Sequence, residues 1–160
     1  LGEAKITIVG VPDVPGTAAR IFTIVAEADA NVDMIVQNVS AAATGRTDIT
    51  FTLPKADAAR AIEALESAKD EVGFEQVLHD DQIGKLALVG AGMRTNVGVS
   101  AKLFRALSDA GINLELISTS EIRISVVTSA AQLHDAVRVV HSAFGLDADE
   151  DAVVHAGTGR

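Results

Sequence analysis

The sequence predicts an α+β fold of two ferredoxin-like βαββαβ domains with antiparallel sheets, packed side by side. Two observations lead to this expectation. One is an internal repeat that divides the chain in half. The other is a hydrophobic period that changes within each half between strand-like alternation and helical spacing. We place the first domain at residues 1–80 and the second at residues 81–160.

The repeat consists of three segments that recur in the same order. Lys85 lies 80 residues after Lys5, but Asn113 lies 82 residues after Asn31, so the second half carries two extra residues between its first strand and first helix. The recurring pairs are Lys5–Gly10 with Lys85–Gly90, Ile21–Phe22 with Leu103–Phe104, and Asn31–Ile35 with Asn113–Ile117.

The first half shows every element of the motif. Residues 5–11 alternate apolar and polar side chains and are rich in β-branched residues, which is typical of a strand. Pro12, Pro15 and Gly16 then interrupt the strand with a turn, because prolines cannot continue a ladder. The elements expected after the turn are a helix at 17–28, strands at 33–40 and 47–53, a second helix from about residue 58, and a closing strand at 75–79.

The second half is expected to repeat this order. Strands are predicted near 85–90, 114–119 and 121–128, and helices near 98–110 and 130–144. The closing strand, near Ala152–His155, is short and its pairing stays open. The terminal strands could be exchanged between the domains, or the last position could be filled from residues upstream of Leu1.

Composition excludes several classes of function. The net charge of -9, from 22 acidic and 13 basic residues without a basic cluster, argues against nucleic acid and against anionic membrane surfaces. The chain has no Cys, and its apolar runs are far shorter than a membrane-spanning helix needs. The first residues do not resemble a signal peptide, so we expect a cytoplasmic location.

The groups that catalysis or a cofactor would require are missing from the sequence. Gly90-Ala91-Gly92 begins like a dinucleotide loop, but the third glycine would fall at Thr95. His134 and His141 lie two helical turns apart, too far to share one ion. Asp147–Asp151 starts like a calcium loop, without its later Gly and Glu. We therefore predict no catalytic residue, no metal and no cofactor.

The turn between residues 10 and 18 has the chemistry of an amino-acid site. A helix N-terminus presents unpaired N–H groups and a partial positive charge to a carboxylate. Gly16 permits close approach to the backbone, and Asp13 could meet an ammonium group. An ordinary turn with Asp13 as a local cap explains the same residues equally well.

A repeated βαββαβ unit with Asp13–Gly16 (D-x-P-G) after its first strand, and Asn31–Ile35 before its second, resembles the ACT domain, a small-molecule sensor. Further stretches resemble the C-terminal regulatory part of bacterial aspartokinases over essentially the whole chain. They are Asp33–Ser40, Thr47–Phe51, Gly84-Lys85, Asn113–Ser125 and His155–Arg160. The resemblance implies a regulatory subunit without kinase activity of its own, which forms a homodimer and a hetero-oligomer with the catalytic aspartokinase subunit.

The same resemblance implies feedback inhibition by threonine, alone or together with lysine. The resemblance places the threonine pocket at an interface, between the first-domain loop of one chain and the second-domain strand entry of a partner chain. Carried onto this sequence, it comprises Asp13, Gly16, Thr17, Ala18, Gln37, Asn113 and Leu114. A second site by symmetry would comprise Asn31, Asp33, Gly92, Met93, Arg94 and Val99, although Arg94 would repel an ammonium group there. Positions that could couple the sites, or simply pack in strands, are Ser40, Thr47, Thr50 and Ser120.

Three alternatives stay open at this stage. The pair of domains could be an assembly module that dimerises enzyme subunits and binds no ligand. It could serve an enzyme of a different amino-acid pathway. It could also be an enzyme in its own right, which is the weakest reading because the catalytic groups are missing.

Overall fold

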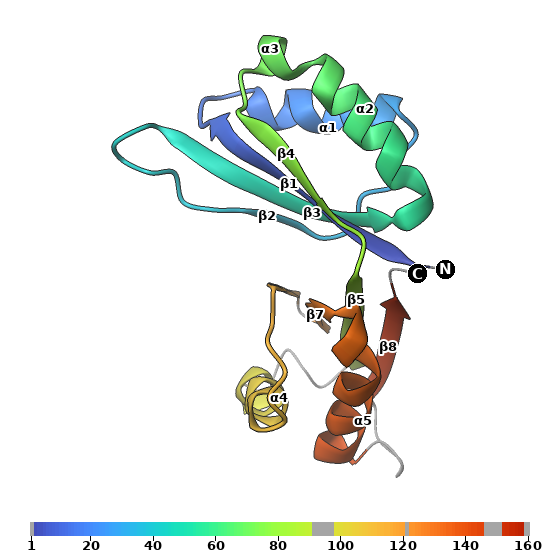
Figure 1. Ribbon diagram of the computed structural model, residues 1–160. Coiled ribbons are helices and arrows are strands. Elements are labelled where there is room, and N and C mark those ends of the chain that lie inside the picture. Colours follow the sequence, from blue (N-terminus) through green and yellow to red (C-terminus); the bar gives the residue numbers. More distant parts are fainter. Residues whose placement is uncertain (1, 91–97, 121, 146–151, 159–160) are drawn as a thin grey trace. The chain divides into compact units, whose positions relative to one another are not determined.

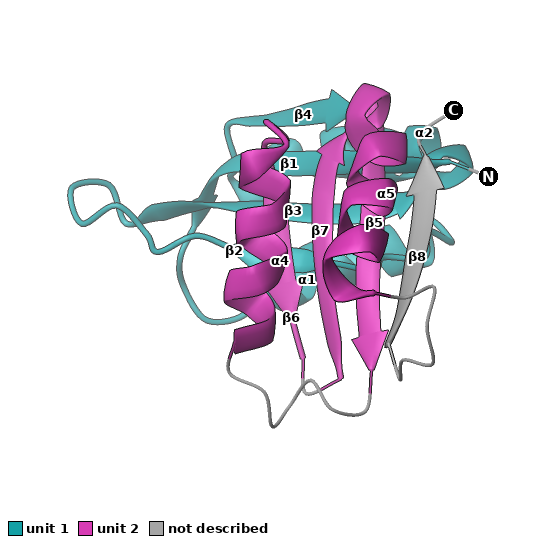
Figure 2. Ribbon diagram, turned by 90° about the horizontal axis from the view of Figure 1, so that it is seen from below, with its two compact units in different colours: residues 1–81, 160 teal, residues 82–159 magenta. Residues whose placement is uncertain are grey.

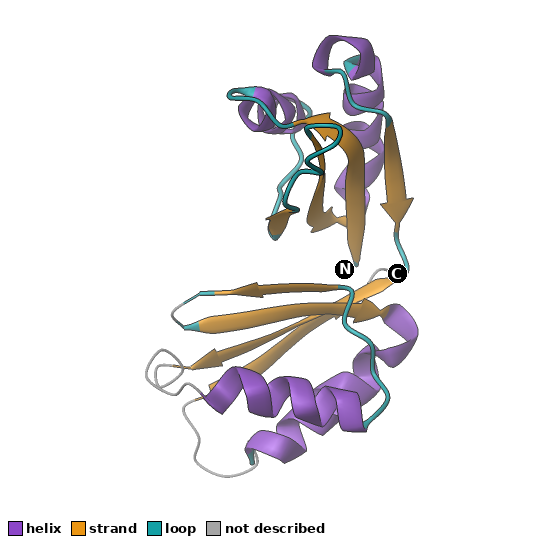
Figure 3. Ribbon diagram, turned by 90° about the vertical axis from the view of Figure 1, so that its left-hand side faces the viewer, coloured by secondary structure: helices purple, strands orange, loops and turns teal. Residues whose placement is uncertain are grey.

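The chain folds as two compact units, residues 1–81 and residues 82–159, which Figure 2 shows in different colours. This computed structural model describes residues 2–90, 98–120, 122–145 and 152–158. Each unit contains one four-stranded antiparallel sheet with helices packed on it (Figure 3). The α+β, ferredoxin-like architecture predicted from the sequence is confirmed.

Unit 1 has the sheet order β2-β3-β1-β4, with its helices on one face of the sheet (Figure 1). The central strands β1 and β3 are long, and the edge strand β2 is short. Its elements are β1 (Glu3–Pro12), α1 (Thr17–Glu27), β2 (Ile35–Gln37), β3 (Arg46–Pro54), a 3₁₀ turn (Lys55–Asp57), α2 (Ala58–Ser67), α3 (Lys69–Val72) and β4 (Gln76–Asp80).

The core of unit 1 follows from the alternation of β1. Ile6 and Ile8 point to the helix side and are fully buried, whereas Lys5 and Thr7 point to the other face. Across the ladder, Ile6 faces Phe51 and Ile8 faces Ile49, so one face of two strands is continuously apolar. Helices α1 and α2 contribute buried residues such as Ile21 and Leu65 to the same core.

Two elements of unit 1 differ from the sequence expectation. The strand expected at 33–40 is only Ile35–Gln37, because the flanking Asp33 and Asn38 make single backbone bonds to β3 without a continuous ladder. The short helix α3 is an additional element, and it ends at Gly73, whose φ of 92° few other residues adopt.

Unit 2 repeats the topology with the order β6-β7-β5-β8. In the described part of this unit, helices α4 and α5 lie on one face of the sheet (Figure 2). Its elements are β5 (Ile83–Gly90), α4 (Gly98–Asp109), β6 (Leu116–Thr119), β7 (Arg123–Ser129), a 3₁₀ turn (Ala130–Gln132), α5 (Leu133–Phe144) and β8 (Ala152–Thr158).

The closing strands pair within their own units. β4 lies antiparallel to β1, and β8 lies antiparallel to β5 from Gly84↔Thr158 to Gly90↔Ala152. The last strand is therefore longer than expected, and its place beside β5 is filled by this chain itself.

Among the described residues, no helix combines the length and the apolar character needed to cross a bilayer.

Candidate functional site

The predicted ligand loop borders a cavity of about 380 Å³ in unit 1. The loop between β1 and α1 forms one side of the cavity, and β2 and β3 contribute the remainder. Five of the seven predicted threonine-site residues lie together here, namely Asp13, Gly16, Thr17, Ala18 and Gln37. The other residues that line it are Val11, Pro12, Val14, Pro15, Thr47 and Ile49.

Helix α1 directs its N-terminus at this cavity. Gly16 is the N-cap, with φ 94°, and it has no side chain that could occupy the N–H groups of the first turn. Thr17 N–H donates to the Val14 carbonyl oxygen at 3.3 Å, and Arg20 N–H donates to the Gly16 carbonyl oxygen at 2.9 Å. Ala18 and Ala19 lie between these two residues, and their N–H groups have no carbonyl acceptor within the helix because they belong to its first turn. No acidic residue lies in the first turn of α1 to neutralise its positive end.

Asp13 and Gln37 meet at the exposed rim of the cavity. Gln37 donates from Nε2 to Oδ1 of Asp13 at 3.4 Å, which is long for a hydrogen bond. The backbone of Asp13 is anchored to the residue before β3, because its N–H donates to the carbonyl oxygen of Gly45 at 2.9 Å. A carboxylate, an amide and a helix N-terminus thus converge on one space.

The base of the cavity is apolar apart from one hydroxyl group. Val11 and Ile49 are buried, and Thr47, which pairs with Val11 across the ladder, is 5% exposed. Thr47 donates from Oγ1 to the carbonyl oxygen of Asn38 at 2.5 Å. From the sequence, Thr47 was expected only as a coupling position or a strand-packing residue. Its contact with the cavity was missed, although Thr47 and Ile49 are two apart on β3 and so share a face.

The two remaining residues of the predicted threonine site belong to unit 2. Asn113 is exposed just before β6, and the side chain of Leu114 packs against the core of its own unit. Their contribution to a pocket stays a prediction.

The residues of the predicted second site are divided between the two units, with Asn31 and Asp33 in unit 1 and Val99 in unit 2. Asn31 donates its backbone N–H to Oδ2 of Asp57 at 3.2 Å, and Asp33 donates its own to the carbonyl oxygen of Thr52. Val99 packs beside Leu103 in the core of unit 2. Gly92, Met93 and Arg94 lie outside the described residues, as does Asp147–Asp151.

The other predicted coupling positions are not among the residues that line the cavity. The hydroxyl groups of Thr50 and Thr7 are 3.0 Å apart on the sheet face opposite the helices. Ser40 is half-buried after β2, and Ser120 donates its N–H to the carbonyl oxygen of Arg123 in the turn between β6 and β7.

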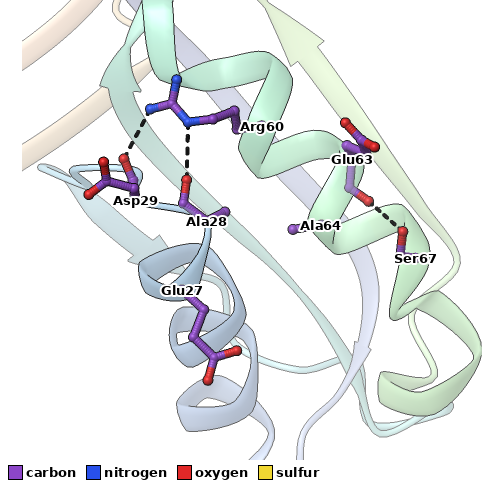
Figure 4. Close-up of a pocket in the computed structure, with 7 residues that line it drawn as sticks. All are labelled: Glu27, Ala28, Asp29, Arg60, Glu63, Ala64 and Ser67. Carbon is purple, nitrogen blue, oxygen red and sulfur yellow. Dashed lines mark hydrogen bonds between the residues drawn. The ribbon is translucent and has the colours of Figure 1, made fainter.

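A second, more open cavity lies where α1 ends beside α2 (Figure 4). Arg60 reaches across it and donates to the carbonyl oxygens of Ala28 at 3.1 Å and Asp29 at 3.0 Å. These bonds satisfy acceptors at the C-terminal end of α1, so Arg60 has a structural role. Within the described ranges, no cluster of three or more His, Cys, Asp or Glu side chains could hold a metal ion.

Comparison with known proteins agrees with this architecture. The ACT domain family model matches residues 6–68 and 86–144. The regulatory subunit of aspartate kinase from Thermus flavus is 42% identical, with a TM-score of 0.81 over 90% of this chain and 94% of that one. The chain belongs to the ACT-domain regulatory family of the aspartokinases.

Two further relatives show how much of an aspartokinase this region represents. A crystal structure of aspartokinase alpha and beta subunits matches with 44% identity and a TM-score of 0.83, over 90% of this chain and 93% of that one. The aspartokinase of Mycolicibacterium smegmatis is 58% identical over 158 residues. That match covers 99% of this chain but only 38% of the length of the relative. The chain therefore corresponds to the regulatory ACT region, as the sequence indicated.

Proposed function

We propose that this chain is the feedback sensor of an aspartokinase and that it binds threonine in the unit 1 cavity. The observation that carries the proposal is the convergence of the α1 N-terminus and the Asp13 carboxylate on a space of about 380 Å³. Opposite charges presented to one small cavity suit a zwitterion with a carboxylate and an ammonium group on the same carbon.

The recognition we propose uses each group in turn. The N–H groups at the start of α1, next to Gly16, accommodate the α-carboxylate. Asp13 accepts hydrogen bonds from the α-ammonium group, in the place where it now accepts one from Gln37. The amide of Gln37 is then free to hydrogen-bond the side-chain hydroxyl. Val11 and Ile49 contact the methyl group, which favours threonine over serine.

Inhibition requires a second subunit. A crystal structure of aspartokinase alpha and beta subunits, 44% identical to this chain, supports the proposal that this chain assembles with a catalytic partner as well as with itself. Threonine inhibits only if it binds the inactive arrangement of subunits more tightly than the active one. A typical coupling of about 1–3 kcal/mol corresponds to roughly 5–150-fold inhibition. In this role the chain works in the cytoplasm and controls the phosphorylation of aspartate, in the pathway that leads to lysine, threonine and methionine.

Lysine is the second effector we propose, acting with threonine through Asn31, Asp33 and the other residues predicted for the second site. The competing proposal is an assembly module that only joins subunits. An assembly module does not explain why the N-terminus of α1 has no side-chain cap and lies beside the Asp13 carboxylate at one cavity.

Calorimetric titration of the chain with threonine separates these proposals. We expect saturable threonine binding and much weaker binding of valine and serine, with lysine titrated both alone and with threonine present. Asp13→Ala removes the ammonium partner and should abolish the heat. Asp135→Ala, which removes an exposed aspartate on α5, is the matched control and should bind like the original chain. If no amino acid binds, the assembly module is the better description.

A further inference from the structure

Strand β1 contains a β-bulge immediately before the ligand loop. Ile8 pairs with Ile49 and Val11 pairs with Thr47, so Val9 and Gly10 together face the single residue Asp48. Gly10 has φ 70°, a conformation that glycine adopts without strain.

The bulge determines which residues at the end of β1 have their side chains on the face of the sheet that borders the cavity. In a regular strand residues 8 and 10 would share a face, and Val11 would point to the opposite side. With the extra residue, Val11 lies on the same face as Ile8 and borders the cavity beside Thr47 and Ile49. Without it, Val11 and the residues after it would be turned to the other face.

Two side chains of β3 form hydrogen bonds with the backbone groups of Gly10 that the bulge leaves out of the ladder. Gly10 N–H donates to Oδ1 of Asp48 at 3.1 Å. Arg46 donates from Nη1 to the carbonyl oxygen of Gly10 at 2.6 Å and to that of Gly73 at 2.7 Å. Both interactions are partly buried, where hydrogen bonds to charged groups are stronger than at the surface. Arg46 thereby also ties the bulge to the end of α3.

Unit 2 has no equivalent arrangement in the described part of its ladder. Strands β5 and β7 pair without a register shift from Ile83↔Ser129 to Val89↔Arg123. The position opposite Val89 is occupied by Arg123, and Gly90 N–H donates to the backbone oxygen of Ile122. The bulge and its two side chains therefore distinguish the strand that leads to the cavity.

We infer that Arg46 and Asp48 are positioning residues for the effector cavity, acting through the Gly10 bulge. They fix the register of β1, so that Val11 and Asp13 border the cavity, although neither side chain needs to touch the ligand. This inference rests on the proposed function, because it assigns residues that set the affinity of the same site.

The test combines threonine titration with amide hydrogen exchange by NMR. The variants are Arg46→Met and Asp48→Ala, with Asp48→Asn as the conservative replacement that retains an acceptor oxygen. The matched controls are Arg138→Met and Asp135→Ala, which break an exposed ion pair on α5. Thermal unfolding of each variant verifies that it is folded at the temperature of the titration.

We expect Arg46→Met and Asp48→Ala to weaken threonine binding about tenfold or more, since each removes a hydrogen bond to a charged group. Asp48→Asn should stay within about threefold of the original chain, because a neutral acceptor is retained. In Asp48→Ala, exchange should accelerate at Gly10 and its neighbours but not along the rest of β1. A purely structural role would instead accelerate exchange throughout unit 1.

Original-like threonine affinity in both Arg46→Met and Asp48→Ala would overturn the inference and leave the proposed function intact. Failure of the unaltered chain to bind threonine would overturn the proposed function. In that case the exchange of Gly10 in Asp48→Ala still decides whether the side chain holds the bulge.

Discussion

The Nε2 atom of Gln37 lies 3.4 Å from Oδ1 of Asp13 and bridges the edge strand β2 to the loop after β1. This bond is longer than an amide–carboxylate hydrogen bond at its optimum, and both side chains are exposed. An incoming ammonium group is a stronger partner for the carboxylate than the amide is. The contact is therefore one that a ligand can replace, which releases the amide for a second interaction.

Replacement of Gln37 should weaken the binding of threonine without affecting an analogue that lacks the hydroxyl group. We expect Gln37→Leu to weaken threonine binding about two- to tenfold, the effect of one neutral hydrogen bond, while binding of 2-aminobutyrate stays unchanged. The two amino acids differ only in the hydroxyl group. Competitive titration of both ligands measures the ratio, and Gln76→Leu on the exposed edge strand β4 is the control. An equal loss for both ligands would assign Gln37 to packing instead.

The conformation of Gly16 gives a second prediction. Gly16→Ala places a Cβ where no atom lies within 4 Å, so the cost arises from φ 94° and not from a clash. We expect a loss of about 1–2 kcal/mol in stability, together with weaker threonine binding. Gly145→Ala imposes a similar strain at φ 61° in unit 2, also with open space around the Cβ. It should lower stability in a thermal melt without changing threonine affinity, and equal affinities in the two variants would contradict the role of Gly16.

The repeat and the hydrophobic period were enough to predict the α+β, ferredoxin-like architecture. Ile6, Ile8, Ile21 and Phe51 are buried where their spacing indicates, because a long amphipathic pattern has one favourable way to cover a sheet. The loop residues Asp13 to Ala18 border one cavity, because they form the turn between a strand and the helix that follows it. Their binding of a ligand stays a prediction.

The bulge could not be predicted in the same way. It depends on which residue of β3 lies opposite Gly10, and Asp48 is 38 positions away along the chain. Local pattern does not specify the register of such distant strands. The short helix α3 was missed for a related reason, because four residues are too few for a period to be recognised.

Packing at Gly84 supplies a prediction for unit 2. A Cβ added to Gly84 would lie 2.7 Å from Cβ of Leu133, at the point where α5 begins on the sheet. We expect Gly84→Ala to destabilise the chain by about 1–3 kcal/mol through overpacking. Denaturant unfolding of Gly84→Ala, Leu133→Ala and the double variant should show a double loss smaller than the sum of the single losses, because removal of the leucine side chain relieves the crowding. Simple additivity would show that the two residues do not compete for space.

Asp57 makes the stability of unit 1 depend on pH in the acidic range. The backbone N–H of Asn31 lowers the pKa of Asp57 below 3.8, desolvation opposes this shift, and the Arg60 guanidinium reinforces it. A carboxylate with a lowered pKa in the folded state stabilises the fold above its unfolded pKa. That contribution is lost as pH falls from about 3.8 through the lower folded value. Because the Asn31 bond is the largest cause, the pKa of Asp57 in Arg60→Met should remain below 3.8, as an NMR titration of the carboxyl carbon would measure. Return of the pKa to 3.8 in that variant would assign the effect to Arg60 instead.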